Sequence, residues 1–307
     1  MSRGVKKKMI IESNKTISNE ITFPLWGGHI SIAENIAFAF DRAESINTTA
    51  MQIFTKSNRI WQGKDLLDEM IENFKNRSLN SSIKYINVHA GYLINLASDN
   101  DEVAQKSFFS LIEELKRCQL LGIKDLVLHP GSAKNKEFKK TLNQVSNFLN
   151  KALNETENVN ILIENMAGQG NAICGDFEEI AELLHLTNNK KLAVCLDTCH
   201  AFAFGYSLEA LKTNIKKNLD FNIIKLFHLN NSLKELGSKV DRHAHLENGA
   251  IEKEEFEYIL NDSLFLDKPK ILETPNDSEQ EYRGDLSIMA SYYKYKIAKS
   301  SPLHVYQ

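Results

Sequence analysis

Eight short apolar runs, most of which end in His, Asp or Glu, constrain the fold of this chain more than any other feature. The clearest is Leu192–His200 (LAVCLDTCH), an apolar run that reaches an acid at Asp197 and a histidine three residues later. Short apolar runs of this kind are typical of buried parallel strands. The eight predicted strands are Trp26–Ser31, Ala50–Thr55, Tyr85–His89, Asp125–His129, Asn160–Glu164, the run that begins at Leu192, Ile223–His228 and Lys270–Glu273.

Amphipathic segments separate the apolar runs. The predicted helices are Ala33–Ile46, Asp65–Leu79, Glu102–Leu121, Phe138–Leu153, Phe177–Leu186, Leu208–Leu219, Lys253–Leu260 and Tyr282–Ile297. A strand followed by a helix, repeated eight times without a break in composition, predicts an α/β fold, a single-domain (β/α)₈ TIM barrel with its active site at the carboxyl ends of the strands. We expect a polar N-terminal extension over residues 1–22 and the barrel over residues 23–307.

Composition sets limits on the partners. The chain is 42% hydrophobic and 25% charged, with a formal net charge of −3, so any nucleic-acid binding must come from a local patch rather than from the overall charge. No apolar run approaches the roughly 18 residues of a membrane-spanning helix, and no signal-peptide core is present. We therefore expect a soluble, intracellular protein that does not contact membranes.

Four cysteines, at positions 118, 174, 195 and 199, show neither a C-x-x-C pattern nor a regular spacing. We interpret them as reduced thiols in a reducing compartment. Cys199, between Asp197 and His200, has two interpretations: a packed thiol, which we favour, or a soft metal ligand.

Nine residues are candidate metal ligands, and most stand at or just after a predicted strand end. They are His89, His129, Glu164, Asp197, His200, His228, Asp241, His243 and Glu273. Each alone has a simpler interpretation as a polar or ion-paired residue, but nine at matching barrel positions favour a metal cluster. This set exceeds the four ligands of one tetrahedral zinc ion and suits two or three ions. Imidazole with carboxylate favours zinc, and manganese or iron would also accept it.

The spacing of the ligands suggests how they are shared. Asp241 and His243 lie two residues apart, so in extended chain their side chains share a face and suit one ion. Asp197 and His200 lie three apart and in a strand would point in opposite directions, so we expect them to bind different ions. Three divalent ions would outweigh the four carboxylates and leave a positive site, a suitable receptor for a phosphodiester. His29 remains open as either a substrate or ligand-supporting contact or a plain polar residue.

Several segments that contain these residues resemble the signature stretches of the endonuclease IV family. They are LVLHPGS at 126–132, IENMAGQG at 163–170, CLDTCHAFA at 195–203, HLN at 228–230 with VDRH at 240–243, and LETPN at 272–276. The resemblance extends from about Trp26 to Asn276. It implies an apurinic/apyrimidinic DNA-repair endonuclease on a (β/α)₈ barrel with three zinc ions. The donor set itself would also allow Mn²⁺ to substitute.

Carried over to this chain, the resemblance implies three ligand sets. They are His89, His129 and Glu164; Glu164, Asp197, His228 and Glu273; and His200, Asp241 and His243. Glu164, which bridges two ions, and Glu273 are the implied catalytic carboxylates. The implied reaction is hydrolysis of the phosphodiester 5′ to an abasic site by an ion-activated water, leaving a 3′-hydroxyl, and the same chemistry would clear blocked 3′ ends.

Two loops bear on the DNA substrate. TKSNRIW at 55–61 and HAGYLIN at 89–95 are similar to family loops whose Arg and Tyr enter the duplex at the lesion, here Arg59 and Tyr92. Lys56 and Arg59 are candidate phosphate or groove contacts. A missing base lowers the cost of kinking the duplex. The alternative is an ordinary exposed loop with Trp61 packed on the barrel. We expect a monomer acting on double-stranded DNA.

The chain departs from the family pattern at several loops. Asn231 follows His-Leu-Asn where an acid is usual, Lys239 replaces an arginine, and Glu247 and Glu252 stand at usual glycine positions. Ser31–Asn35 replaces a loop of small residues. Because an acid often supports a ligand histidine, we expect Asn231 to weaken one such contact. The nine ligand positions are intact, so these departures concern loop shape and DNA affinity.

Two other functions compete with the endonuclease. One is a metal-dependent sugar isomerase or epimerase on a similar barrel, which would use fewer than three ions and has no need of the Arg59 and Tyr92 loops. The other is a catalytically silent binder of abasic DNA, for which the loss of a ligand would be the expected mark. The complete ligand set favours the enzyme.

Overall fold

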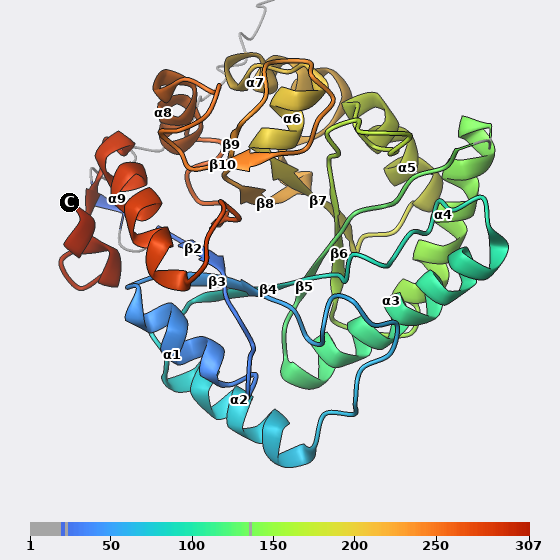
Figure 1. The fold of residues 1–307 in the computed structure, drawn as a ribbon, viewed down its shortest axis with the longest axis horizontal. Coiled ribbons are helices and arrows are strands. Elements are labelled where there is room, and N and C mark those ends of the chain that lie inside the picture. The colour runs from blue at the N-terminus through green and yellow to red at the C-terminus, as the bar shows by residue number, and fades with distance from the viewer. Residues whose placement is uncertain (1–19, 22–23, 135–136) are drawn as a thin grey trace, which may run out of the picture.

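The computed structural model describes residues 20–21, 24–134 and 137–307 and has eight parallel strands closed into a barrel. In barrel order the strands are β11 (Lys270–Leu272), β2 (Trp26–His29), β3 (Ala50–Ile53), β4 (Tyr85–His89), β5 (Asp125–Leu128), β6 (Asn160–Glu164), β7 (Leu192–Asp197) and β8 (Ile224–His228). The predicted TIM barrel is confirmed. Figure 1 shows the strands at the centre of the molecule with the helices arranged around them.

The helices are α1 (Phe38–Ser45), α2 (Asp68–Asn80), α3 (Asp101–Leu121), α4 (Phe138–Leu153), α5 (Phe177–Thr187), α6 (Thr198–Phe204), α7 (Leu208–Asn218), α8 (Lys253–Asn261) and α9 (Tyr282–Tyr292). The longest, α3, is capped at its N-terminus by Asn100, whose side chain accepts hydrogen bonds from the backbone N–H groups of Glu102 and Val103. It ends at Gly122, which adopts φ +77° and serves as the predicted C-cap. Among the helices of the described residues, none is long and apolar enough to cross a membrane.

Two predicted helix boundaries are wrong. The segment from Ala33 does not start a helix: Glu34 has φ +69°, the side chain of Asn35 accepts a hydrogen bond from Ala37 N–H, and α1 begins only at Phe38. At the other end of the chain α9 stops at Tyr292. The residues that follow include β12 (Lys296–Ile297), which pairs in parallel with β1 (Glu20–Ile21).

The predicted N-terminal extension, 1–22, lies outside the described residues except for β1, which joins the C-terminal strand rather than standing apart. Three short 3₁₀ segments, Phe221–Ile223, Glu279–Glu281 and Pro302–Tyr306, complete the regular structure together with an antiparallel pair. That pair joins β9 (Asn231–Ser232) to β10 (His243–Ala244).

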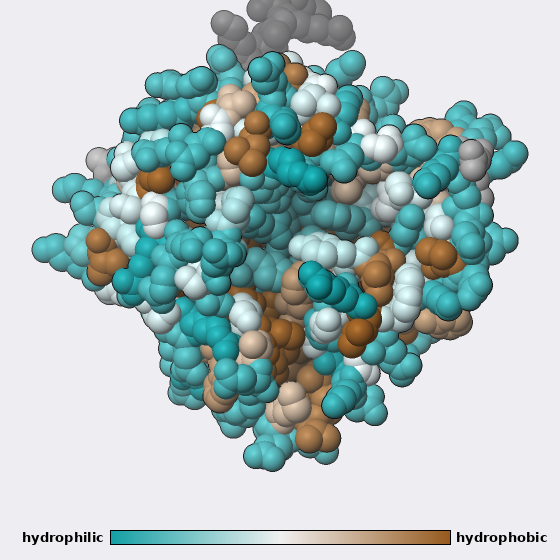
Figure 2. All heavy atoms as spheres, viewed as in Figure 1, coloured by the Kyte–Doolittle hydropathy of each residue, from teal (hydrophilic) through white to brown (hydrophobic). Residues whose placement is uncertain are grey.

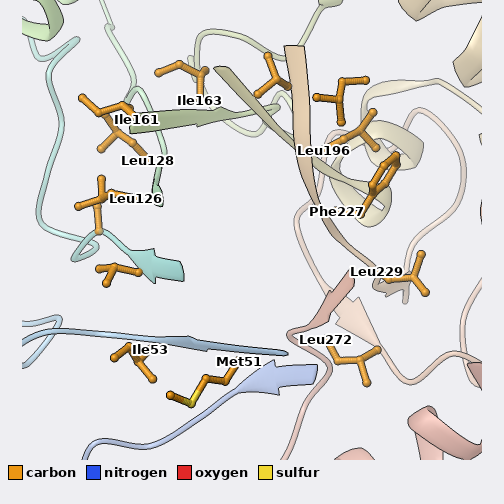
Figure 3. Close-up of a cluster of buried hydrophobic side chains, with 14 of the residues drawn as sticks. Met51, Ile53, Leu126, Leu128, Ile161, Ile163, Leu196, Phe227, Leu229 and Leu272 are labelled. Carbon is orange, nitrogen blue, oxygen red and sulfur yellow. The ribbon is translucent and has the colours of Figure 1, made fainter. Parts of the chain in front are cut away.

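The core has two layers because side chains alternate along each strand. Figure 3 shows the outer layer, in which residues such as Ile161, Ile163 and Phe227 lie between the strands and the helices. The inner layer fills the barrel with Ala50, Val127, Leu162, Ala193, Cys195, Leu226 and Ile271. A residue two positions beyond an inner-layer residue also faces the barrel axis, which sets the position of the site.

Candidate metal centre

The alternation of the strands brings the strand-end ligands together. Glu164 lies two residues after Leu162 on β6, and His228 two residues after Leu226 on β8. The same spacing relates inner-layer residues to His129, Asp197 and Glu273. The ligands therefore stand directly above the apolar filling of the barrel, at the carboxyl ends of the strands. The face seen in Figure 2 is hollowed near its centre, where hydrophilic residues gather.

Glu164 is the centre of the cluster. Its carboxylate is fully buried, and each of its oxygens faces two imidazoles. Oε2 lies 3.3 Å from Nε2 of His89 and 3.1 Å from Nε2 of His129. Oε1 lies 3.1 Å from Nδ1 of His200 and 3.2 Å from Nδ1 of His228. Glu164 thus presents a separate oxygen to each side of the cluster, as a bridging carboxylate does.

The remaining ligands extend the cluster toward solvent. Nδ1 of His228 lies 3.1 Å from Oε2 of Glu273. Asp241, whose side chain is 40% exposed, has Oδ2 3.3 Å from Nε2 of His200 and Oδ1 3.5 Å from Nε2 of His243. The predicted sets coincide with three groups whose ligand atoms all lie within 4.8 Å of one another. They are His89, His129 and Glu164; Glu164, Asp197, His228 and Glu273; and His200, Asp241 and His243.

The strand geometry assumed for Asp197 and His200 is wrong. The strand β7 ends at Asp197, and α6 begins at the next residue, so His200 lies on the first turn of a helix. Oδ1 of Asp197 caps this helix by accepting a hydrogen bond from His200 N–H at 2.6 Å, and Oδ2 accepts one from Asn230 Nδ2 at 2.7 Å. The two side chains fall in different ligand groups, although Asp197 also lies 3.6 Å from Nε2 of His243.

Hydrogen bonds fix the orientation of four imidazoles. Nδ1 of His89 donates to the Ala90 carbonyl at 2.7 Å, and Nδ1 of His243 donates to the Glu273 carbonyl at 3.1 Å. Nδ1 of His200 donates to the Asn165 carbonyl at 2.9 Å. Nε2 of His228 donates to Oε1 of Gln52 at 2.8 Å. Because a carbonyl oxygen only accepts, the opposite nitrogen of each neutral ring carries a lone pair directed into the cluster.

These lone pairs fit a site for cations. Nε2 of His200, Nδ1 of His228, Nε2 of His243 and Oε1 of Glu164 are buried and have no hydrogen-bond partner within the described part of the chain. Such acceptors repel one another unless a positive charge, either protons or metal ions, lies among them. The donor set of imidazole and carboxylate, with its outer nitrogens already oriented, suits zinc and related transition metals.

The pKa values show how strongly these groups interact. Burial alone would raise the pKa of Glu164, but the positive charges of His129 and His228 outweigh it and hold that pKa well below its usual range. Burial likewise opposes the charge on His200, yet Asp197 and Asp241 raise the pKa of its imidazole well above the usual value. Protons therefore take the place of a metal ion when none is bound.

Two cysteines lie beside the ligands. Cys195 lies within reach of Glu164 and His228, and Cys199 within reach of Asp197 and His243. Burial raises the pKa of each thiol to about 12, so each thiol is protonated in the metal-free protein at neutral pH. The thiol of Cys199 donates a weak hydrogen bond to the Arg242 carbonyl at 3.6 Å. This geometry favours the packed-thiol interpretation.

Gln52 is a site residue that the sequence analysis missed. It is fully buried, and all four of its hydrogen-bonding positions are used. Its Oε1 accepts from His228 Nε2 at 2.8 Å and from Asn87 Nδ2 at 2.5 Å, while its Nε2 donates to Glu273 Oε1 at 2.6 Å and to Nδ1 of His29 at 3.0 Å. Gln52 thus orients two candidate ligands and bonds to His29, whose Nδ1 also lies 3.7 Å from Oε1 of Glu273. Its position two residues after the inward-facing Ala50 was the signal available in the sequence.

Replacing Gln52 tests this role. The variant Gln52→Leu removes the acceptor that orients His228 and the donor that holds Glu273, and we expect metal affinity to fall about 10- to 100-fold. Competition with a fluorescent chelator measures the change. The control Gln119→Leu alters an amide on α3 that accepts from Glu157 N–H, away from the ligands, and its metal affinity should stay at the parent level. Unchanged affinity in Gln52→Leu would contradict the assignment.

The three candidate DNA contacts differ in exposure. Arg59 is exposed, and Tyr92 is 64% exposed, with its ring edge-on to Phe54 at 5.6 Å and to His89 at 5.8 Å. Lys56 is different, since its side chain is only 3% exposed. Its ammonium donates to the Trp61 carbonyl at 2.6 Å and to Ser110 Oγ at 2.9 Å, so the structure does not support its prediction as a phosphate contact.

The family departures act on loop shape. Asn231 does not support a ligand histidine: its Nδ2 donates to the carbonyls of Leu246 (2.7 Å) and Ile251 (3.0 Å), and its Oδ1 accepts from Ile251 N–H. A carboxylate cannot make these two donations. Lys239 donates to the Phe204 carbonyl at the end of α6 and lies over the Phe204 ring. Glu247 and Glu252 are exposed.

A cavity of about 300 Å³ opens beside the cluster. Its wall includes the ligands His89 and His129, the exposed Tyr92, and Gln169, whose Oε1 accepts a hydrogen bond from Asp241 N–H at 2.9 Å. This cavity leaves space for a small group between the candidate metal ligands and the Tyr92 loop.

Comparison with known proteins gives consistent relatives. A model of the family described as xylose isomerase-like TIM barrel matches residues 40–292. The chain is 38% identical over 278 residues to a protein named probable endonuclease 4 from Chloroflexus aurantiacus. This alignment covers 87% of this chain and 98% of that protein. It is 34% identical to the apurinic-apyrimidinic endonuclease 1 of Plasmodium falciparum, over 88% of this chain and 46% of that protein.

Among solved structures, endonuclease IV from Thermus thermophilus aligns with a TM-score of 0.79 and 33% identity, over 88% of this chain and 98% of that one. A D-tagatose 3-epimerase-like protein aligns with a TM-score of 0.67 but only 18% identity, over 89% of this chain and 97% of that one. The second likeness reflects the shared barrel alone.

Proposed function

Because the chain belongs to the endonuclease IV family, we propose that it is an AP endonuclease that cleaves the phosphodiester 5′ to an abasic site in double-stranded DNA and leaves a 3′-hydroxyl. We further propose that it binds three zinc ions, which Mn²⁺ can replace, that it removes blocking groups from 3′ ends, and that it acts as a monomer. The observation that carries the proposal is the convergence of nine imidazole and carboxylate side chains into three groups at the barrel mouth.

The chain's own residues account for most of the proposed site. Glu164 directs one carboxylate oxygen toward His89 and His129 and the other toward His200 and His228. Divalent ions, when bound by the three groups, would supply a water of lowered pKa and positive charge for the phosphate oxygens. Asp241 and His243 lie nearer the solvent, and this is the side from which the substrate strand would approach.

DNA binding is proposed for two exposed side chains. Tyr92 stands at the edge of the cavity beside His89, and Arg59 lies on the neighbouring loop. A duplex that lacks one base resists kinking less, so an aromatic wedge at this position favours the damaged site. Although 64% of the side chain is exposed, partial desolvation at the cavity edge and the charges of Glu273 and Glu164 raise the pKa of Tyr92 to about 12, so its hydroxyl is neutral beside phosphates.

A nicking assay combined with metal analysis tests the function. The substrate is a duplex that contains one abasic analogue. We expect the zinc-loaded protein to cut the strand immediately 5′ to the analogue and to leave an undamaged duplex intact. Fewer than two ions per chain together with turnover of a free sugar would overturn the proposal in favour of an isomerase or epimerase. Tight binding to abasic duplex without cleavage would overturn it in favour of a silent binder.

Tyr92→Ala separates recognition from chemistry. We expect preference for abasic over intact duplex to fall about tenfold, because stacking of an aromatic ring on a base contributes roughly 1–3 kcal/mol. Metal content should not change. Phe109→Ala on α3 removes an aromatic ring of equal exposure, 64%, away from the site and serves as the control. Fluorescence anisotropy with both duplexes measures the ratio, and a loss of bound zinc in Tyr92→Ala would contradict the proposed role.

A further inference from the structure

The two loops proposed to contact DNA lie against the same helix. We define the Arg59 loop as residues 55–64, after β3, and the Tyr92 loop as residues 90–95, after β4. The loops lie close together: a Cβ atom added to Gly91 would lie 3.5 Å from the carbonyl oxygen of Asn58 and 3.2 Å from Oε1 of Glu114 on α3. Gly91 therefore allows the Tyr92 loop to approach both the other loop and the helix.

Lys56 fastens the Arg59 loop to α3. Its buried ammonium donates to the Trp61 carbonyl within the same loop, and to Ser110 Oγ and Glu113 Oε2 on α3, the latter at 3.2 Å. It also lies 3.7 Å from Oε1 of Glu114. A buried cation with these partners is fixed in position, because any movement would leave its charge uncompensated.

Glu114 is shared by the two loops. Its side chain is 1% exposed, and its Oε1 both accepts a hydrogen bond from Gly91 N–H at 3.0 Å and pairs with Lys56. The neighbouring Glu113 holds only the Arg59 loop, since its oxygens accept from Gly63 N–H at 2.8 Å and from Lys56. Arg117 also serves only that loop, by donating to the carbonyls of Thr55 and Lys64.

We propose that Glu114 is a positioning residue that couples the Arg59 loop to the Tyr92 loop, so that the two side chains proposed to enter DNA are presented as one rigid unit. The inference rests on the proposed function for its relevance to DNA, but the coupling itself rests on the contacts of Lys56, Gly91 and Glu114. A carboxylate is needed here because it accepts from a backbone N–H and compensates the buried ammonium at the same oxygen.

Amide hydrogen exchange on the zinc-loaded full chain tests the coupling without DNA. Glu114→Ala should raise exchange about tenfold in both loops, since local opening free energies follow the loss of buried contacts. Lys56→Met should also raise exchange in both loops, because it removes the ammonium that pairs with Glu114. The matched control Glu113→Ala should raise exchange in the Arg59 loop alone. Should a single variant fail to fold, Lys56→Met/Glu114→Gln removes both charges of that pair together and leaves Glu113 with Arg117, 3.9 Å away, as its remaining cation.

Kinetics on abasic duplex adds a second measurement. Glu114→Ala should raise KM about tenfold with kcat changed less than about twofold and zinc content unchanged, because loop order affects binding more than chemistry. The coupling is overturned if Lys56→Met leaves the Tyr92 loop as protected as in the parent, or if Glu114→Ala loosens that loop alone. If the parent enzyme cannot nick abasic DNA, the proposed function is wrong. If the enzyme is active but hydrogen exchange in the two loops changes independently, only the coupling is wrong.

Discussion

Glu164→Gln is expected to fold like the parent protein and to lose nicking of abasic DNA by several orders of magnitude. The amide has nearly the same volume as the carboxylate and fits the same buried space. It offers only one acceptor oxygen, however, and its NH₂ group would meet either the His89 and His129 pair or the His200 and His228 pair. One ligand group therefore loses its carboxylate oxygen, and the bridge between groups is broken.

The measurements are kcat on a duplex with one abasic analogue, metal content, and a thermal melt. Glu44→Gln is the matched control: Glu44 also accepts side-chain hydrogen bonds, from Ser81 at 2.6 Å and Arg77 at 3.1 Å, but it lies on α1, outside the ligand groups. Glu44→Gln should lower the free energy of unfolding by about 1 kcal/mol and leave nicking at the parent level. Near-parental cleavage by Glu164→Gln would remove the bridging carboxylate from the proposed mechanism.

The barrel could be predicted because its strands carry a strong and repeated signal. Most strands are largely apolar on both faces, and each predicted run ends in a polar residue. The predicted strands agree with the observed ones to within two residues in every case for which both ends are defined, as for Asn160–Glu164. The ligand groups followed from the same signal. Residues such as Glu164 and His228 extend the inward-facing row of their strands, so their convergence is a consequence of the closed sheet.

The helix α6 could not be predicted because it lacks an amphipathic pattern. Six of its seven residues are buried, so apolar side chains surround it, and Leu192–His200 looks like one long strand. The signal that separates strand from helix is the N-cap at Asp197, which is also a candidate metal ligand. In sequence the metal-binding interpretation of that residue concealed its capping role.

Lys56 shows a second limit of the sequence. A lysine beside Arg59 in a loop indicates a phosphate contact on chemical grounds alone. The residues that bind its ammonium, Ser110, Glu113 and Glu114, lie more than 50 positions away on α3, and only the packing of that helix against the loop brings them together. Gln52 was missed because an amide is not a usual zinc ligand. Its importance comes from its hydrogen bonds to His228 and Glu273.

Zinc affinity is expected to fall steeply as the pH is lowered, by about tenfold per pH unit for each proton that metal binding displaces. Against the opposing effect of burial, Asp197 and Asp241 raise the pKa of His200 well above its usual value in the metal-free protein. For His228, again against burial, Cys195 together with Glu273 and Glu164 raises the pKa well above its usual value. These imidazoles are protonated at neutral pH without metal, so metal binding must expel their protons. Lowering the pH therefore makes protons compete more strongly with the metal.

Chelator competition at about pH 6, 7 and 8 gives the slope, and calorimetry in buffers of different ionisation enthalpy counts the protons released on zinc binding. The slope of the logarithm of zinc affinity against pH should approach two or more, because at least two imidazoles change protonation when the metal binds. Asp241→Asn removes one of the carboxylates that raise the pKa of His200, so its slope should be shallower as well as its affinity lower. His185→Gln on α5 deletes a histidine outside the ligand groups and should keep the parental slope. A flat dependence in the parent, with no proton release, would mean that the imidazoles at the barrel mouth do not bind the metal.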